Sequence, residues 1–290
     1  MTPPPVELPV PSAASLAGSR AAENFPIAAW VLRPGRRQAR AAIYGFCRLV
    51  DDLGDEFAGD RVAALRALRD DLGRCWGGRP VHPVLRRLQP VIAAHRLEPD
   101  PFLRLVAANL QDQEVVRYRD WEELAAYCTL SATPVGELVL ALEGIADRSR
   151  VGWSDRICTG LQLANMWQDV ASDRARGRRY LPLAVLQEAG ADEDSWWRGV
   201  ATAPLRTALA AAVSRARQEL AAGWPLVAGV RGLLRVEMAT FVRSGLAACQ
   251  AVEAAGDRVF SERARIPKAG RRRALLGAVP ALWRPGRGPA

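Results

Sequence analysis

Two stretches of this chain place carboxylates at helical spacing among apolar residues. The first holds four of them within six residues, Asp51, Asp52, Asp55 and Glu56. Asp51 and Asp55 stand four residues apart and therefore project from one face of a helix. Like charges at that spacing destabilise an isolated helix by about 0.2–0.5 kcal/mol, so we expect a neutralising partner. Arg48 and Tyr44 precede them on the same side.

The second stretch carries a polar stripe on a helix that is otherwise apolar. At about 100° per residue the stripe is roughly 80° wide. It consists of Gln162, Asn165, Asp169 and Asp173. Leu163, Met166 and Trp167 indicate that the rest of this helix is buried, where unpaired charges are unfavourable. One pair of carboxylates is common on solvated helices, but two pairs on apolar helices predict a functional site.

Clustered carboxylates that face one another across a cavity suit Mg²⁺, which takes oxygen ligands, keeps several waters and commonly binds phosphate. Arginine and tyrosine beside them suit the oxygens of a diphosphate. A metal ion and arginine together stabilise a departing diphosphate, which makes ionisation of an allylic or cyclopropylcarbinyl carbon feasible. An apolar cavity lined by aromatic rings would hold a hydrocarbon chain and shelter the cation. The alternative for the first stretch is a solvated helix end.

Helices must position both stretches. Apolar residues recur at helical spacing through most of the chain after residue 20, and alternating, strand-like runs are essentially absent. Gly and Pro separate the segments, and the fingerprints of dinucleotide and phosphate loops are missing. We therefore predict an all-α domain of roughly nine to eleven helices, with no linker between two halves. The expected helices are 37–57, 61–76, 82–95, 101–117, 121–130, 135–145, 154–174, 205–223 and 231–256.

Composition narrows the class of protein. The chain has 290 residues, of which 49% are hydrophobic and 24% charged, as is typical of a folded soluble protein. No window approaches the roughly 18 unbroken apolar residues of a membrane span, and we expect no secretory signal. Five scattered cysteines without a CxxC pair, and only two histidines, disfavour disulfide and zinc sites. A reduced, cytoplasmic setting fits best.

The net charge of +9 is concentrated at one end. Residues 258–290 contain nine Arg or Lys against one acid, Glu262, so the rest of the chain is nearly neutral and nucleic acid is not expected as a partner. Two interpretations of this basic tail stay open. It is either a solvated, poorly ordered terminus, or it makes peripheral contact with anionic membrane through its apolar segment 274–283. Residues 1–20 are rich in Pro and are expected to be disordered.

The order and spacing of these motifs resemble the squalene and phytoene synthase family of head-to-head prenyl synthases. The matching elements span about residues 24–185, with a helical continuation to about residue 257. They are Tyr44-xxx-Arg48-xx-Asp51-Asp52-xx-Asp55-Glu56, Tyr127 with Pro134-Val135-Gly136, Gln162-xx-Asn165-xxx-Asp169-xxx-Asp173, and Arg179-Tyr180-Leu181-Pro182. The resemblance implies a single-domain class I isoprenoid synthase fold over residues 21–257, with helices surrounding a central cavity.

The resemblance also implies roles for individual residues. The ligands of Mg²⁺ would be Asp51, Asp55, Asp169 and Asp173, with Asp52 and Glu56 close by. The residues that bind or orient the diphosphate would be Tyr44, Arg48, Gln162 and Asn165. Tyr127 would line the cavity near the cation.

Several features lean towards the branch of bacterial hydroxysqualene synthases. They are Glu23-Asn24-Phe25-Pro26, Asp112-Gln113-Glu114 followed by Arg117-Tyr118, Ser131-Ala-Thr-Pro134-Val-Gly136, and Asn165-Met-Trp167-Gln168-Asp169. Gln168 stands where phytoene and presqualene diphosphate synthases usually have arginine. The implied reaction converts presqualene diphosphate and water to hydroxysqualene and diphosphate with Mg²⁺ and without NADPH, in squalene and hopanoid biosynthesis. A presqualene diphosphate synthase and a hydroxysqualene reductase would be its functional partners.

Other functions stay open. Head-to-head condensation of two prenyl diphosphates would yield presqualene diphosphate, squalene or phytoene. A helical protein without enzymatic activity would use the basic tail to bind membrane or nucleic acid. A terpene cyclase is disfavoured, because the second motif lacks the Asn-Asp, Ser/Thr, Glu pattern usual in those enzymes.

Some single residues also have two interpretations. Asn24, with Phe25, closes the mouth of the pocket or else caps a helix. Arg117 reaches the diphosphate or else pairs with Glu114. Three further expectations concern packing: Trp167 in the core, Cys47 and Cys128 as small apolar fillers, and His82 and His95 on the surface.

Overall fold

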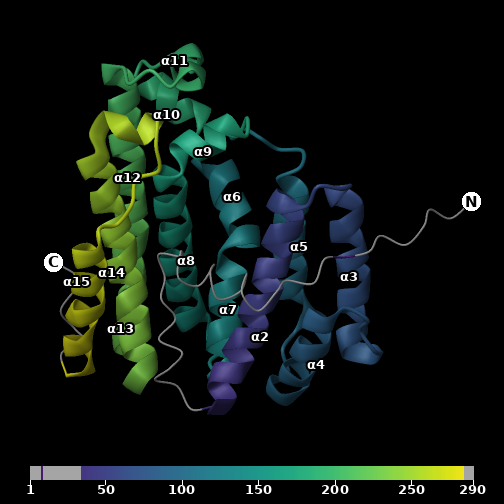
Figure 1. Cartoon of the computed structure of the whole chain (residues 1–290). Helices are drawn as coiled ribbons and strands as arrows, with labels where there is room; N and C mark the ends of the chain where they lie inside the picture. The colour runs from purple at the N-terminus through teal and green to yellow at the C-terminus, as the bar shows by residue number, and fades with distance from the viewer. Residues whose placement is uncertain (1–7, 9–33, 284–290) are drawn as a thin grey trace, which may run out of the picture. The chain divides into compact units, whose positions relative to one another are not determined.

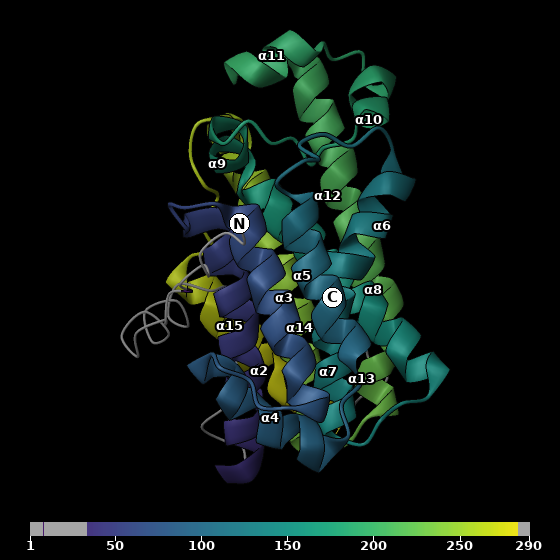
Figure 2. The same cartoon turned by 90° about the vertical axis from the view of Figure 1, so that its right-hand side faces the viewer.

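The computed structural model describes residue 8 and residues 34–283. Every regular element in these residues is a helix (Figure 1, Figure 2). A single bridge between Arg117 and Arg179 is the one β-type pairing in the described residues. The prediction of an all-α fold is therefore confirmed. The predictions for residues 1–20 and for Asn24 and Phe25 fall outside the described part of the chain.

The helices group into two compact units. Unit 1 contains the described residues up to Val115 together with Pro134–Ala146, and unit 2 contains Val116–Thr133 and the described residues from Asp147 onwards. Because the chain passes between the units more than once, no single linker divides the sequence. The expected domain boundaries at residues 20 and 257 stay predictions.

Unit 1 is built around a core of interlocking aromatic and aliphatic side chains. Its elements are α2 (Pro34–Asp51), η2 (Asp52–Glu56), α3 (Arg61–Gly77), α4 (Pro83–His95), α5 (Pro99–Gln111) and most of α7 (Thr133–Leu142). The rings of Phe46 and Phe102 meet edge to face at 5.3 Å, which joins α2 to α5. Asp60 caps α3 by accepting a hydrogen bond from Ala63 N–H at 2.9 Å.

His82 is buried, so the expectation that it lies on the surface is wrong. Its Nδ1 accepts from Val84 N–H at 3.3 Å and caps α4. The Asp71 carboxylate accepts from the backbone N–H groups of Val81 and His82, each at 2.8 Å. The buried Asp71 carboxylate thus holds residues 81–82 in the interior. The helical periodicity of the sequence does not predict such a contact.

Unit 2 is organised by three long helices. They are α8 (Arg148–Gln168), α12 (Ala203–Gly223) and α14 (Gly232–Ala255), and each packs against the other two. Two glycines allow α8 and α12 to approach closely. A Cβ atom on Gly160 would lie 2.9 Å from the backbone nitrogen of Leu220, and one on Gly223 would lie 2.8 Å from the carbonyl oxygen of Trp153.

Shorter helices complete unit 2. They are α6 (Trp121–Ser131), α9 (Val170–Ala175), α10 (Leu183–Glu188), α11 (Glu193–Arg198) and α13 (Pro225–Gly229). The periodicity of the sequence does not reveal α10, α11 and α13, because five or six residues are too few to show a helical repeat.

The basic C-terminal segment is folded. It forms η3 (Gly256–Phe260), α15 (Lys268–Ala278) and η4 (Val279–Leu282), and all three pack against α14. Buried Ala274, Ala278 and Ala281 face the protein, and their small side chains allow close packing. The interpretation as a solvated, poorly ordered terminus therefore does not hold for residues 258–282.

One helical stretch in the described residues, Trp121–Leu142, is long and apolar enough to cross a membrane. Half of it is buried inside the protein. It covers α6 and α7, and Tyr127 and Leu138 within it belong to the buried core. A core helix passes the same test of length and composition, so this stretch is weak evidence for a membrane span.

Candidate active site

The first acidic motif lies where α2 ends in a π-turn. The helix carries Tyr44 and Arg48 and ends at Asp51. The next five residues form η2, in which Phe57 N–H donates to Asp52 O at 2.9 Å. We predicted one continuous α-helix through residue 57, and the structure widens its last turn instead. Such π-turns are rare and occur frequently at functional sites.

Arg48 neutralises part of this motif. Its Nη2 atom lies 2.6 Å from Asp52 Oδ1 and 2.9 Å from Glu56 Oε1. Burial raises the pKa of the Asp52 carboxyl, and the charge of Arg48 opposes that rise. Arg48 thus pairs with Asp52 and Glu56, whereas the spacing had suggested it as the partner of Asp51 and Asp55.

Polar side chains from α3 and from the turn after α5 hold the backbone of η2. Gln113 Nε2 donates to the Gly54 carbonyl at 3.1 Å and to the Asn109 carbonyl at 2.9 Å. Arg61 donates to the carbonyls of Asp55 and Phe57 at 2.9 and 3.0 Å. The carbonyl groups that a π-turn leaves without regular α-helical partners are therefore satisfied by side chains.

The second acidic motif spans a break between two helices. The helix α8 contains Gln162 and Asn165 and ends at Gln168. Asp169 has φ −98° and ψ 8°, outside the helical region, and α9 then carries Asp173. Hydrogen bonds from Asp169 N–H to Asn165 O and from Asp173 N–H to Asp169 O, at 3.0 and 2.9 Å, carry the helical register across the break. The polar stripe predicted from the sequence is thus continuous along α8 and α9.

Asn165 contributes an unsatisfied oxygen to this stripe. Its Oδ1 atom is buried and has no hydrogen-bond partner among the described residues. A buried polar atom without a partner is unfavourable by about 1–3 kcal/mol. This atom lies one turn before Asp169, where a water or a ligand atom would satisfy it.

The C-terminal segment reaches the second motif through Gln168. This side chain is 0% exposed, and its Nε2 donates to the Ala264 carbonyl at 2.6 Å. In return, Ala264 N–H donates to the Gln168 carbonyl at 3.1 Å. Arg263, the adjacent residue, places its Nε 2.8 Å from Asp169 Oδ1.

Arg263 is the residue that the sequence analysis missed. It was counted only as part of the basic tail, because about 90 residues separate it from the motif it joins. Burial raises the pKa of the Asp169 carboxyl, while the charges of Arg263 and Arg176 and a hydrogen bond from Ser172 act in the opposite direction. The arginine therefore provides a cation beside the second motif even though position 168 holds glutamine.

Three tyrosines converge in unit 2. The rings of Tyr118, Tyr127 and Tyr180 lie within 5.5–5.7 Å of one another. Arg179 N–H donates to Val116 O at 2.7 Å, and Leu183 N–H donates to Tyr118 O at 3.0 Å. These bonds hold two motifs that are distant in sequence side by side against α6, which carries Tyr127. Tyr127 is thus one member of an aromatic cluster that also includes Tyr118 and Tyr180.

Arg117 does not pair with Glu114 as one interpretation had it. Its Nη1 lies 3.7 Å from Glu193 Oε1, and its guanidinium carbon lies 4.9 Å from the centre of the Trp197 ring. Arg179 also pairs with Glu193, so α11 anchors both arginines.

Trp167 and Cys128 pack as expected. Trp167 is 1% exposed and meets Trp121 edge to face at 6.3 Å, which confirms its place in the core. Cys128 is 0% exposed, and burial raises the pKa of its thiol to about 12, which makes it an inert filler.

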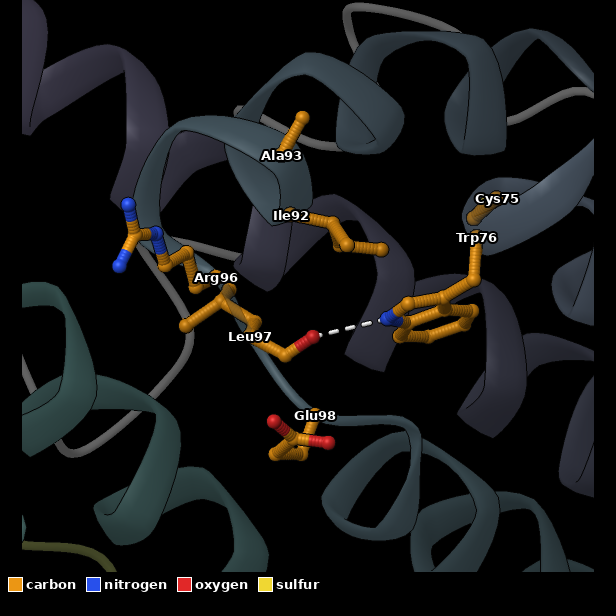
Figure 3. Close-up of a pocket in the computed structure, with 7 residues that line it drawn as sticks. All are labelled: Cys75, Trp76, Ile92, Ala93, Arg96, Leu97 and Glu98. Atoms are coloured by element: carbon orange, nitrogen blue, oxygen red, sulfur yellow. Dashed lines mark hydrogen bonds between the residues drawn. The ribbon is translucent and has the colours of Figure 1, made fainter.

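A pocket in unit 1 is separate from these motifs. It has a volume of about 330 Å³ and opens beside the end of α3 and the end of α4. Figure 3 shows the Trp76 indole at its wall, donating from Nε1 to the Leu97 carbonyl at 2.8 Å. None of the predicted site residues lines it.

The donor atoms of both motifs fit Mg²⁺. Each motif offers carboxylate oxygens one helical turn apart, and the second adds the unsatisfied Asn165 Oδ1. In the described residues no three His, Cys, Asp or Glu side chains gather into a complete metal site. Mg²⁺ commonly takes only one or two carboxylates and fills its shell with water and phosphate oxygens. The motifs belong to different units, and their opposition across a cavity stays a prediction.

Comparison with known sequences identifies the family. Residues 19–270 match the squalene/phytoene synthase family. This range contains both acidic motifs and Arg263. The chain belongs to that family. Two hydroxysqualene synthases are among the relatives that are similar in sequence to this chain. The one from Rhodopseudomonas palustris is 34% identical over 212 residues, or 72% of each chain. The one from Zymomonas mobilis is 34% identical over 206 residues, or 68% of this chain and 67% of the relative.

Other family members are also similar. The presqualene diphosphate synthase of Zymomonas mobilis is 32% identical over 183 residues, or 62% of each chain. Among solved structures, a squalene synthase from Alicyclobacillus acidocaldarius has a TM-score of 0.76 and 38% identity, covering 84% of this chain and 97% of its own. A dehydrosqualene synthase has a TM-score of 0.81 over 93% of this chain and 95% of its own; at 20% identity it shows the fold alone. The protein therefore has the all-α isoprenoid synthase fold and is an enzyme of the head-to-head prenyl synthase family.

Proposed function

We propose that this enzyme converts presqualene diphosphate and water into hydroxysqualene and diphosphate. The observation that carries this choice within the family is the 34% identity to two hydroxysqualene synthases over about 70% of each chain. Gln168 itself brings no charge, but Arg263 supplies a cation to the second motif, so the choice rests on the sequence identity and not on the charge of position 168. The substrate would come from a presqualene diphosphate synthase, and the alcohol would pass to a hydroxysqualene reductase.

In this proposal the ligands of Mg²⁺ are Asp51, Asp55, Asp169 and Asp173. Bound Mg²⁺ would neutralise the diphosphate oxygens and so favour departure of the leaving group. Arg263 keeps the Asp169 carboxylate oriented through its 2.8 Å contact. Arg48 pairs with Asp52, the first residue of η2, which keeps the motif ordered.

The substrate's own groups meet other side chains. Tyr44 and Arg48 bind the diphosphate from α2, and Gln162 and Asn165 bind it from α8. The unsatisfied Oδ1 of Asn165 accepts from a water or from a protonated diphosphate oxygen. Departure of the diphosphate opens the cyclopropane ring, and water adds to the rearranged cation and loses a proton, so that hydroxysqualene, diphosphate and a proton are released.

The tyrosine cluster shelters that cation. Aromatic ring faces stabilise positive charge by about 0.5–2 kcal/mol each, more when water is excluded. Tyr127 and Tyr118 are buried, at 4% and 2% exposure, so their rings act in a medium of low polarity. The reaction needs no reductant, because capture by water ends it at the alcohol.

The second candidate is condensation of two prenyl diphosphates. It is favoured by the 32% identity to a presqualene diphosphate synthase, although the match covers less of each chain. The two functions differ in the substrate that is consumed. Condensation starts from farnesyl or geranylgeranyl diphosphate, whereas the proposed reaction starts from presqualene diphosphate.

Product analysis separates these candidates. Purified protein is incubated with Mg²⁺ and, in separate reactions, with presqualene diphosphate or farnesyl diphosphate, each with and without NADPH. We expect hydroxysqualene from presqualene diphosphate irrespective of NADPH, with the hydroxyl oxygen taken from ¹⁸O-labelled water. Unchanged presqualene diphosphate together with turnover of farnesyl diphosphate would assign the condensation instead.

A further inference from the structure

We propose that the outer face of α15 and η4 is a docking surface for an anionic lipid membrane. This α15 face consists of Lys268, Arg271, Arg272, Arg273, Leu275, Leu276, Val279 and Trp283, all of them exposed. Leu276 is 63% and Trp283 74% exposed. Large apolar side chains exposed to that degree on one short segment are typical of a surface that binds a partner.

The opposite side of the same helix is fully used, so the α15 face cannot turn into the core. Ala274, Ala278 and Ala281 are buried against the protein, and α15 packs along α14 (Figure 1). Arg235 of α14 donates to the Leu282 carbonyl at 3.5 Å, which ties the end of η4 down. The exposed side chains are therefore presented on a helix that is already fixed.

Helical geometry places apolar and basic residues together on the outward face of α15. At about 100° per residue, Leu275, Leu276 and Val279 fall within an arc of roughly 100°. Lys268 and Arg272 lie within the same arc, nearer the start of α15, and Arg271 and Arg273 flank it, so basic and apolar residues share one outward face. In interfacial helices the apolar side chains enter the boundary between headgroups and acyl chains, and the basic side chains pair with anionic headgroups. The residue after η4 is a tryptophan, the side chain that is enriched at that boundary.

Charge identifies the occupant of the surface. No Asp or Glu occurs between Arg263 and Trp283, so all the charged side chains of this segment are positive and complement the negative potential of anionic lipid. A second copy of the chain, docked about a two-fold axis, would bring the same positive patch against itself. Nucleic acid would pair with the arginines but would leave the leucines and Val279 exposed.

Vesicle flotation tests the proposal without any need for turnover, so its outcome is independent of the proposed reaction. The full chain is mixed with phosphatidylcholine vesicles that contain about 30% phosphatidylglycerol, or with pure phosphatidylcholine. We expect binding to the anionic vesicles only, and weaker binding as salt rises. The double variant Leu276→Gln/Trp283→Gln should lower the affinity about tenfold or more.

Matched controls separate the α15 face from general surface effects. Leu233→Gln changes another exposed leucine, at the start of α14, and should leave binding unchanged. Replacing Arg271, Arg272 and Arg273 with Gln should weaken binding, whereas the same change at exposed Arg66, Arg87 and Arg148 should do so much less. Melting temperatures verify that every variant is folded.

Two results would overturn the proposal. One is a wild-type chain that does not float with anionic vesicles. This result would also overturn the proposal if the wild-type chain proved to be a dimer that Leu276→Gln/Trp283→Gln dissociates, because the surface would then bind a second copy. The other is a double variant that binds anionic vesicles as tightly as the wild-type chain.

Discussion

The side-chain amide of Gln168 joins the end of α8 to residues 261–266. The side chain donates from Nε2 to the Ala264 carbonyl at 2.6 Å, and the Gln168 backbone carbonyl accepts from Ala264 N–H at 3.1 Å; together these bonds fix the backbone next to Arg263. The guanidinium of Arg263 is thereby delivered to Asp169. A neutral residue in the core thus positions a charged residue at the motif.

Gln168→Leu should release this segment. The substitution keeps the volume but leaves the Ala264 carbonyl without its partner, which destabilises the fold by about 1–3 kcal/mol. Hydrogen exchange at the Ala264 amide should accelerate, as measured by mass spectrometry. Gln187→Leu, at an exposed position of α10, is the control and should change stability by less than about 0.5 kcal/mol. Unchanged exchange at Ala264 in Gln168→Leu would contradict the positioning role.

Buried thiols give a prediction about pH. Burial raises the pKa of Cys128 to about 12 and the pKa of Cys75 and Cys249 to about 11, from an ordinary value of 9.0. Because these pKa values are raised in the folded state, the thiols' contribution to stability is complete below pH 9.0 and is lost as pH rises towards 11 and 12.

Iodoacetamide labelling near pH 9 measures this difference. In the native protein, the half-buried Cys47 and Cys158 should react first. The three buried thiols should react only after denaturant is added. Equal labelling of all five cysteines in the native state would contradict the burial of Cys75, Cys128 and Cys249.

At the scale of elements, the π-turn of η2 depends on a close approach by α5. A Cβ atom on Gly54 would lie 2.1 Å from Asn109 Oδ1. Gly54 therefore allows α5 to bring Gln113 within reach of the Gly54 carbonyl. The first acidic motif is shaped by a helix that lies more than 50 residues further along the chain.

Gly54→Ala should disturb this element. The added methyl group forces Asn109 aside, and overpacking of this kind destabilises by about 1–3 kcal/mol. Asn109→Ala in the same chain should restore part of the loss, and a double-mutant cycle from denaturant unfolding measures the coupling. Gly73→Ala in α3 is the control: nothing lies within 4 Å of its Cβ position, so we expect a gain of about 0.4–1 kcal/mol. Additive effects of Gly54→Ala and Asn109→Ala on the free energy of unfolding would contradict the close approach of Asn109 to Gly54.

The spacing of residues along the sequence predicts those features that depend on residues close in sequence. The positions of α2, α8, α12 and α14, the polar stripe and the pairing of Arg48 with Asp52 all depend on residues within a turn or two. The π-turn, the break at Asp169 and the contact of Arg263 depend on partners far away in sequence, so periodicity does not report them. The burial of His82 is missed for the same reason, because it depends on the Asp71 carboxylate, which accepts a hydrogen bond from His82 N–H.

At the scale of the whole molecule, the chain joins two compact units, each with one acidic motif. The family resemblance predicted from the motifs is confirmed by the match over residues 19–270. The proposed reaction requires more than membership of the family: in it, each motif binds Mg²⁺ and both motifs contribute to the same step. The loss of either should therefore abolish turnover while leaving the fold intact.

Release of diphosphate from presqualene diphosphate tests that claim most directly. The rate is measured across a titration of Mg²⁺ for the wild-type chain, Asp51→Asn and Asp169→Asn, with circular dichroism to verify folding. We expect the wild-type rate to depend on Mg²⁺ and each variant to be slower by about 100-fold or more, because each loses a metal ligand and not a core contact. A folded variant that releases diphosphate at nearly the wild-type rate, or wild-type release that ignores Mg²⁺, would contradict the account.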